Sequence, residues 1–307
     1  MSGSGGRLNI TSADLKQLRE DLERRLEREQ ASSEVNAYLR DELLAANDRD
    51  VDAVNRHLDQ IRDALGDRVE EFDRLLMGGS IAKHTYVEGF SDVDSIVVVG
   101  AEGEQRPPEE FREEFARILR GALSAGEVDD ISVGRRAVTV KFRDGTEVQL
   151  LPAMQQGDAI SISSAEGTQW QSGIRPQDFA IRLTDLNRAQ AGMPVRTIKL
   201  AKEVLANSVP EDRRPSGYHV EALALDLLPA YEGPRTPKEM LTYLFRASSD
   251  RVLAPLPDVT GQSRNVDDGL GGAGSPERRS LSQRLGAIAD TMEGARTLAA
   301  WKGLFGE

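Results

Sequence analysis

The sequence predicts a mixed α/β (α+β) protein, with helices toward both ends and a small group of strands between them. Apolar residues recur at helical spacing over residues 11–77 and again after residue 176. Short apolar or alternating runs over residues 93–99 and 138–150 have the pattern of strands. Because 307 residues can form more than one core, we expect two lobes, over residues 1–165 and 166–307.

Composition and charge narrow the possible functions. Hydrophobic residues make up 39% of the chain and charged residues 29%, an ordinary balance for a globular protein. The net charge of −12 argues against general nucleic-acid binding, which needs a basic face. The chain has no cysteine for a disulfide, and its three scattered histidines argue against a zinc site. Because no apolar run could cross a bilayer and the first residues lack a signal peptide, we expect a cytoplasmic protein without a membrane partner.

Two stripes of apolar residues predict two helices before the first strand. The first stripe consists of Leu15, Leu18, Leu22 and Leu26, and the second of Val51, Val54, Leu58, Ile61 and Leu65. Residues at these spacings share one face of a helix. Such faces more often pack against the protein's own core than against a partner helix, so we interpret both stripes as core-facing. A partner helix remains the alternative.

The central feature of the sequence is a glycine turn followed by two aspartates at the head of a strand. Gly78, Gly79 and Ser80 form the turn, and Asp92 and Asp94 begin the next apolar run. Residues two apart in a strand point to the same face, so the two carboxylates would repel unless a cation lay between them. Oxygen ligands of this kind suit Mg²⁺. The backbone of a glycine turn and a nearby hydroxyl suit phosphate, so the stretch indicates nucleotide chemistry.

A helix and a β-hairpin are predicted after this strand. Pro107 and Pro108 open the helix, whose apolar positions share one face. The hairpin is indicated by alternating Val138, Val140 and Phe142, an Asp144–Gly145 turn, and alternating Val148 and Leu150. Glu147 and Gln149 therefore share the other face of the return strand.

The C-terminal part of the chain is predicted to be mostly helical. Residues 154–176 show little periodicity, and we interpret them as a crossover between the lobes in which Trp170 packs internally. Helices are expected to follow Pro176, to begin near Pro194, and to follow the capping residues Thr236 and Ser275. The last helix is expected to run to the C-terminus.

A long loop is predicted over residues 253–275, before the last helix. Asp258, Asp267 and Asp268 lie in it and could be considered metal ligands. We interpret them instead as solvated loop acids.

The order of these parts resembles the active-site signature of the polymerase-β nucleotidyltransferase superfamily. That signature is Gly-Ser, roughly a dozen residues, and then Asp-x-Asp at the head of an apolar strand. With Lys83, Thr85, Gly89 and Ser91 in the gap, the stretch is more specifically similar to that of bacterial CD-NTases, relatives of cyclic GMP-AMP synthase and oligoadenylate synthetase. The resemblance implies a polymerase-β-like core sheet that faces a C-terminal helical lobe across a nucleotide cleft. It also implies a long bracing helix, for which residues 50–75 are suited.

The resemblance also implies roles for the central residues. Asp92 and Asp94 would be catalytic residues that hold Mg²⁺, or Mn²⁺, in a two-metal scheme. Gly79 and Ser80 would bind the triphosphate of an NTP substrate such as ATP or GTP. The catalytic lobe would then be residues 1–165, and residues 166–307 would close the nucleotide cleft.

Two further motifs would complete the nucleotide site. Lys199 and Lys202 match the family's basic helix facing the triphosphate, and we favour Lys202 as the contact; the alternative is a solvated basic face. Tyr218 matches a tyrosine that stacks on the donor base. Gly217 replaces the serine that usually precedes it, so either Ser216 or the backbone N–H of Gly217 would contact phosphate.

One position departs from the family pattern. The resembled family carries its third metal-binding carboxylate three residues before a proline, and Gln149 takes that place before Pro152. Glutamine offers a neutral carbonyl oxygen, so the metal site loses one negative charge. Glu147 is the nearest substitute ligand, but it lies about 7 Å away along the strand. Three explanations stay open: a variant that traps substrate, a natural enzyme that uses Glu147, or a relative that binds nucleotides without turnover.

The function that the resemblance implies is the joining of NTPs into a cyclic di- or trinucleotide, a second messenger of bacterial antiphage defence (CBASS). A downstream effector would then recognise the product rather than this protein. Two alternatives remain, namely a catalytically inactive nucleotide-binding homologue and an RNA-tailing nucleotidyltransferase. The second needs a basic track for its polymer, and this acidic chain shows no obvious one.

Overall fold

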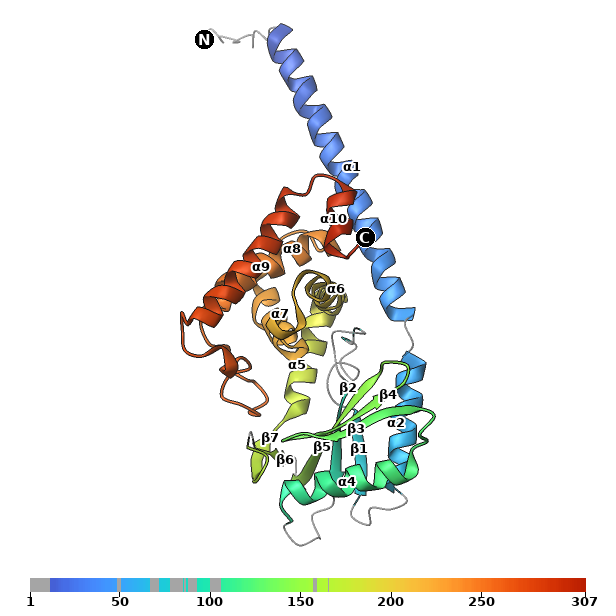
Figure 1. The fold of residues 1–307 in the computed structure, drawn as a ribbon. Coiled ribbons are helices and arrows are strands. Elements are labelled where there is room, and N and C mark those ends of the chain that lie inside the picture. The colour runs from blue at the N-terminus through green and yellow to red at the C-terminus, as the bar shows by residue number, and fades with distance from the viewer. Residues whose placement is uncertain are drawn as a thin grey trace.

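A computed structural model gives the arrangement of the chain. It describes residues 12–48, 51–66, 72–77, 85, 87, 93–99, 106–156, 159–164 and 166–307. Helices lie toward both ends of the chain and the strands between them, which confirms the predicted mixed fold class (Figure 1). None of the helices within these residues combines the length and apolar content needed to cross a membrane.

Seven strands of the described residues form one sheet. They are β1 (Phe72–Met77), β2 (Val93–Val99), β3 (Val128–Val133), β4 (Val138–Phe142), β5 (Glu147–Gln156), β6 (Ala159–Ser163) and β7 (Trp170–Ile174). The order across the sheet is β1-β2-β5-β4-β3, and β6 pairs with the second half of β5 and with β7. β2 and β5 run parallel, whereas the other pairs run antiparallel.

The predicted hairpin forms from β4 and β5. Its alternating apolar residues Val138, Val140, Phe142, Val148 and Leu150 are all buried. Gly145 adopts a φ of 93°, a left-handed conformation that glycine reaches without a steric penalty. The neighbouring Asp144 accepts a hydrogen bond from the backbone N–H of Thr146 at 2.9 Å, which closes the turn.

Two helices cover one face of the sheet, α2 (Val51–Gly66) and α4 (Pro108–Ala122). Val54, Leu58, Ile61 and Leu65 of α2 are buried in a cluster with α4 and the strands, so the second predicted stripe is core-facing. The predicted bracing helix over residues 50–75 is wrong in extent, because α2 ends at Gly66 and β1 begins at Phe72. The long N-terminal helix is instead α1 (Ser12–Asp48).

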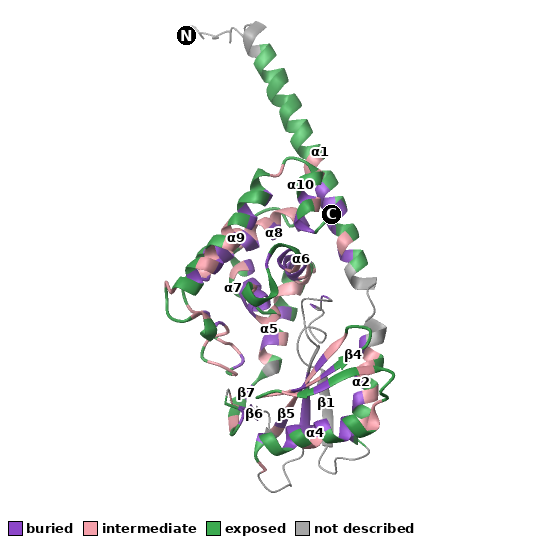
Figure 2. Cartoon of the chain, in the orientation of Figure 1, coloured by how far each residue is buried: buried purple, intermediate pink, exposed green. Residues whose placement is uncertain are grey.

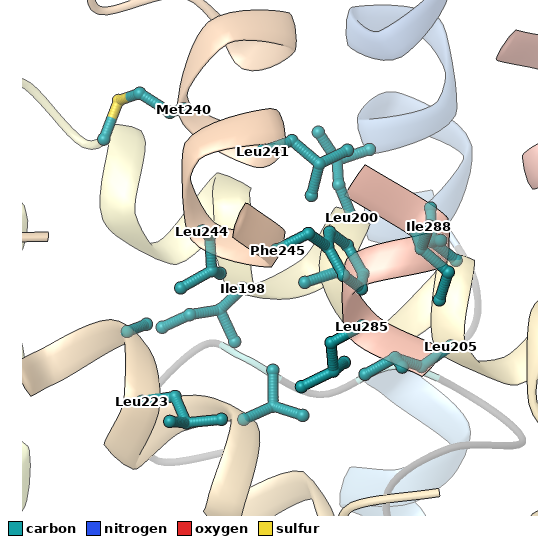
Figure 3. Close-up of a cluster of buried hydrophobic side chains, with 14 of the residues drawn as sticks. Ile198, Leu200, Leu205, Leu223, Met240, Leu241, Leu244, Phe245, Leu285 and Ile288 are labelled. Carbon is teal, nitrogen blue, oxygen red and sulfur yellow. The ribbon is translucent and has the colours of Figure 1, made fainter. Parts of the chain in front are cut away.

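The C-terminal helices build a second core. They are α5 (Pro176–Ala189), α6 (Met193–Ser208), α7 (Gly217–Leu227), α8 (Pro237–Arg251), α9 (Pro276–Gly294) and α10 (Leu298–Leu304), with short 3₁₀ turns at Glu211–Arg213, Leu228–Ala230 and Asp268–Leu270. Figure 3 shows the centre of this core, where α6, α7, α8 and α9 contribute side chains. The prediction of one last helix running to the C-terminus is wrong, because α9 ends at Gly294 and a separate helix follows.

Two features of the packing were not predicted from the sequence. The second half of α1 packs with the C-terminal helices through Val35, Tyr38, Leu39 and Leu43, not with the sheet. The region predicted as a crossover contains β6 and β7, which extend the sheet to residue 174. Trp170 of β7 packs against Phe111 with ring centroids 5.8 Å apart, as its predicted packing role requires. The lobe boundary near residue 165 stays a prediction.

The first half of α1 contradicts the prediction of a core-facing stripe. Leu15, Leu18, Leu22 and Leu26 are 49%, 65%, 54% and 55% exposed. The helix has 37 residues and is therefore about 55 Å long, so only part of it reaches the helical core. The rest projects beyond the body, where its side chains are exposed (Figures 1 and 2).

Candidate functional site

The parallel pairing of β2 with β5 brings two predicted site positions together. Asp94 is the direct register partner of Gln149, and the register continues with Ser95 opposite Leu150. Residues far apart in the sequence thus become neighbours at the start of two central strands. Asp92, Gly79 and Ser80 lie outside the described residues, as does the side chain of Asp94. Their roles stay predictions.

Glu147 lies at the start of β5, two residues before Gln149. Lys141 of β4 is its register partner, and the lysine Nζ lies 2.9 Å from a carboxylate oxygen of Glu147. The hydrogen bond to Glu147 raises the pKa of Lys141. The Glu147 carboxylate therefore already has a cationic partner within the sheet. Its role as a metal ligand stays a prediction.

The described residues alone do not form a metal site. Within them, no group of three or more His, Cys, Asp or Glu side chains could hold a metal ion. Gln149 adds one neutral carbonyl oxygen beside the Asp94 position, which suits a hard cation only weakly. A Mg²⁺ site at this edge therefore depends on the carboxylates of Asp92 and Asp94.

A buried ion pair links the predicted phosphate helix to the central stretch of the chain. Lys202 of α6 is fully buried, and its Nζ lies 2.8 Å from an Oε1 atom of Glu221 in α7. The same Nζ donates to the backbone oxygen of Thr85 at 2.8 Å, and the Thr85 hydroxyl donates to Glu221 at 2.5 Å. Thr85 follows the predicted glycine turn in sequence. The C-terminal helices therefore hold part of the stretch on which the predicted site depends.

These contacts bear on the predicted triphosphate lysines. Lys202 is predicted to reach the triphosphate, yet its ammonium already binds Thr85 and Glu221 among the described residues. Lys199 lies almost one turn earlier on α6 and is partly buried, and burial lowers its pKa. Both triphosphate contacts stay predictions, and the geometry adds a positioning role for Lys202.

Ser216 and Tyr218 lie at the start of α7. The Ser216 hydroxyl caps the helix by accepting a hydrogen bond from the backbone N–H of His219 at 3.2 Å. The Tyr218 ring packs against Phe179, with centroids 5.0 Å apart, and its hydroxyl donates to Asp258 at 2.7 Å. Burial is the main cause of a raised Tyr218 pKa, so the phenol stays protonated. Tyr218 is thus held at both its ring and its hydroxyl.

The prediction that the acids of the 253–275 loop are solvated is wrong for Asp258. Its carboxylate also accepts hydrogen bonds from the backbone N–H and the hydroxyl of Thr260, at 2.8 and 2.7 Å. Ser263 donates to it in the same two ways, at 3.1 and 2.9 Å. Burial alone would raise the pKa of Asp258, but these bonds and the one from Tyr218 hold it below its usual value. Asp258 thus ties the loop to the predicted base-stacking tyrosine.

The same prediction is wrong for Asp267, whereas Asp268 is exposed as expected. Asp267 and Arg278 of α9 are both buried and form an ion pair at 2.6 Å. Arg278 also donates to the backbone oxygens of Val252 and Gly271, each at 3.0 Å. This arginine therefore connects both ends of the loop to the start of α9.

The buried His219 makes the stability of the fold depend on pH. Burial is the main cause that lowers its pKa to about 4, despite Asp267 nearby. Because the folded pKa lies below the unfolded value of about 6.5, the stabilisation is complete above that value and is lost as the pH falls toward 4. We expect the free energy of unfolding to fall by about 2 kcal/mol between pH 7 and pH 4.5 for this reason. Denaturation at both pH values should show a flatter profile for His219→Gln than for the parent; equal profiles would contradict the assignment.

Sequence reasoning missed Glu221, the acid that pairs with Lys202. The available signal was a single acidic residue inside the apolar run from Val220 to Leu225, because a charge inside a buried stripe needs a partner. Arg278 gives a weaker signal, since it lies among polar residues at the start of α9. Neither partner could be named from spacing alone.

Several solved structures have a fold similar to that of this chain. No protein-family model matches the chain, and no curated protein matches it in sequence. Among solved structures, CdnC from E. coli MS115-1 with ATP is similar with a TM-score of 0.67 and 17% identity, over 89% of this chain and 97% of that one. CdnG from Bradyrhizobium diazoefficiens, described as a CD-NTase in complex with GTP, gives 0.61 and 18% identity over 83% and 89%.

A third structure extends the likeness over more of this chain. Escherichia coli DncV, in its 3'-deoxy GTP bound form, is similar with a TM-score of 0.61 and 13% identity, over 97% of this chain and 92% of that one. Sequence identities this low show a shared fold but not a shared activity. The likeness therefore extends over most of the helices and strands of this chain. The chain has the fold of the bacterial CD-NTases.

Proposed function

We propose that the chain is a nucleotidyltransferase that joins NTPs through phosphodiester bonds into a cyclic di- or trinucleotide. The observation that carries the proposal is the register of Asp94 with Gln149 at the start of two central strands of a CD-NTase fold. Neighbours in complex with ATP and GTP support NTPs as the substrates. By the same likeness, we propose that the product serves as a second messenger in bacterial antiphage defence.

The residues of this chain would divide the work as follows. The Gly79–Ser80 turn would hold the triphosphate, and Tyr218, backed by Phe179, would support the base by stacking. Asp92 and Asp94 would hold Mg²⁺, which when bound neutralises the triphosphate and lowers the pKa of the attacking hydroxyl. Lys202 and Glu221 would fix the position of the segment at Thr85. Gln149 would position a bound group through its amide, without adding a negative charge to the site.

A product assay tests the proposal. The full chain is incubated with the four NTPs and Mg²⁺, and the products are separated by chromatography before and after phosphatase treatment. A product that resists phosphatase indicates a cyclic nucleotide, as expected. Extension of an added RNA would instead indicate tailing activity and would overturn the proposal.

One observation favours a second candidate function, nucleotide binding without turnover. Gln149, the register partner of Asp94, carries no negative charge. Protection of the chain by NTP and Mg²⁺ against thermal unfolding, together with no product of any kind, would establish this second function instead.

The metal assignment gives a direct prediction. Changing both Asp92 and Asp94 to Asn should abolish the Mg²⁺-dependent part of NTP binding, because neutral amides cannot balance the cation. Folding should survive, since the substitution keeps the size of both side chains. Titration calorimetry with NTP in Mg²⁺ and in EDTA measures the difference. The control is Asp129→Asn/Asp130→Asn, a pair on β3 at the far edge of the sheet, which should bind like the parent. Equal Mg²⁺-dependent affinity in the double variant and the parent would remove both aspartates from the metal site.

A further inference from the structure

The exposed leucines of α1 form a face that the body of the protein does not use. Leu15, Leu18, Leu22 and Leu26 recur at spacings of three and four residues, so they line one side of the helix. The buried residues Val35, Tyr38, Leu39 and Leu43 point about a third of a turn away from that side, given 3.6 residues per turn. The leucine face and the body-facing surface are therefore different faces of one helix.

The leucine face continues along the second half of α1. Leu44 lies 18 residues after Leu26, which is about five whole turns, and it is 67% exposed. Ser33 and Ala37 fall on the same side between them and are exposed, and so is Arg40, which lies five turns after Leu22. The uninterrupted apolar part of the face is therefore confined to residues 15–26.

The charges beside the leucines change sign along the helix. Lys16 and Arg19 flank one side of the face near the start, and Glu23 and Glu27 flank the same side farther on. In the part of the chain that the structure describes, Arg19, Glu23 and Glu27 have no ion-pair partner, and Lys16 only reaches Glu20 at 3.9 Å. On the other side of the face, Arg25 and Glu29 already pair with each other at 2.9 Å. If a second copy of the helix runs in the opposite direction, the basic residues of this flank lie opposite the acidic residues of the same flank in the other copy.

We propose that this leucine face binds a second copy of the same chain, with the two α1 helices antiparallel. In that arrangement Leu15 meets Leu26 of the second copy and Leu18 meets Leu22. Lys16 and Arg19 then face Glu27 and Glu23 of the second copy, twice by symmetry. Every apolar position meets an apolar one, and each flanking base meets an acid.

Net charge favours the antiparallel arrangement over a parallel one. Residues 12–30 carry five basic and six acidic side chains, a net charge of −1, so the remainder of the chain carries −11. A parallel pair would place these two acidic bodies side by side at one end. An antiparallel pair centred near residue 20 places them at opposite ends, and repulsion is screened over that separation.

The contact area sets the expected strength. Four partly exposed leucines per chain bury less area than a standard interface of about 800 Å² per partner. The helix is already held by its second half, so pairing does not have to form it from a disordered chain. We therefore expect a reversible dimer with a micromolar dissociation constant, not a permanent one.

Sedimentation of the full chain over a range of concentrations tests the self-association. The parent should shift from monomer to dimer, and Leu18→Gln/Leu22→Gln should raise the dissociation constant by about a hundredfold. Ile181→Gln is the matched control, because Ile181 is 57% exposed on another helix and should leave the equilibrium unchanged. A parent that stays monomeric at every concentration overturns the proposal and leaves a different protein as the occupant of the leucine face.

The absence of cysteine allows a test of the direction. Leu15→Cys and Leu26→Cys chains, one carrying an added tag, are mixed and oxidised. Antiparallel pairing should give mainly the mixed disulfide, whereas Arg24→Cys, on the opposite face of the helix, should give none with either. A predominance of same-position disulfides would mean parallel pairing and would overturn the proposed arrangement.

Discussion

Gln149→Asp should raise the rate of pyrophosphate release by about a hundredfold or more with little change in NTP affinity. The expectation rests on the proposed nucleotidyltransferase function and on the register of β2 with β5, which makes Gln149 the neighbour of Asp94. A carboxylate at this position adds a full negative charge where a bound cation would need it. An amide oxygen supplies only a dipole.

Binding and turnover should respond differently for a physical reason. The metal ion that accompanies the triphosphate arrives with its nucleotide, so its binding depends least on position 149. The ion that lowers the pKa of the attacking hydroxyl does not bind together with the nucleotide, so its binding depends on protein carboxylates. The parent should therefore bind NTP as well as Gln149→Asp does but release pyrophosphate slowly.

Two variants serve as controls for this prediction. Gln149→Asn shortens the side chain as much as Gln149→Asp but adds no charge, so it should stay as slow as the parent. Glu147→Gln should also leave the parent's rate unchanged, because Glu147 already pairs with Lys141. A fully active parent that loses its activity in Glu147→Gln would show that Glu147 is the third ligand and that our assignment of position 149 is wrong. Pyrophosphate release in a coupled assay measures all four proteins.

The elements that the sequence predicts well are those with a local signal. The hairpin of β4 and β5 follows from alternating apolar residues on either side of an Asp-Gly turn, and the structure forms it there. The stripe of α2 is buried as its spacing indicates. By contrast, β6 and β7 have five residues each, and β6 pairs with β5 while β7 pairs with β6, so their formation depends on the neighbouring strands.

The failed predictions concern what covers a residue. Leu15 and Leu58 lie in stripes of the same period, yet Leu58 is buried and Leu15 is exposed, because periodicity defines a face without naming its neighbour. The acids of the 253–275 loop have the same limitation. Asp258 and Asp267 find their partners only when the loop folds against α7 and α9.

The sequence proposes the residues of the candidate site but not the contacts that hold them. The spacing of the glycine turn and the aspartates indicates nucleotide chemistry, and the sheet places Asp94 beside Gln149, while the roles of these residues stay predictions. The hold of Lys202 on Thr85 joins residues 117 positions apart, which no local pattern could reveal. The structure thus adds a buried link between the helical lobe and the central stretch.

The last prediction is that Lys202→Met will lower the free energy of unfolding by about 3–5 kcal/mol. The substitution removes the ammonium that pairs with the buried carboxylate of Glu221 and donates to the backbone oxygen of Thr85. A buried charge that loses its counter-ion is strongly destabilising, whereas two well-packed apolar side chains in place of a buried pair often cost little. The double variant Lys202→Met/Glu221→Leu should therefore recover most of the loss. Lys199→Met, in the same helix but only partly buried, is the matched control and should cost much less.

The double variant also separates the two roles considered for Lys202. If Lys202 contacts the triphosphate, the double variant, although stable, should bind NTP more weakly by about 1.5–3 kcal/mol, the value of a charge-assisted bond. Its affinity for the free nucleoside should then be unchanged. A Lys202 that only positions the segment at Thr85 would give equal changes for both ligands. Urea denaturation and paired binding measurements on the same preparations decide between them. Because the ammonium is fully buried and already bound by Glu221 and Thr85, we expect equal changes. A loss confined to NTP would instead mean that Lys202 leaves its buried partners when the nucleotide binds.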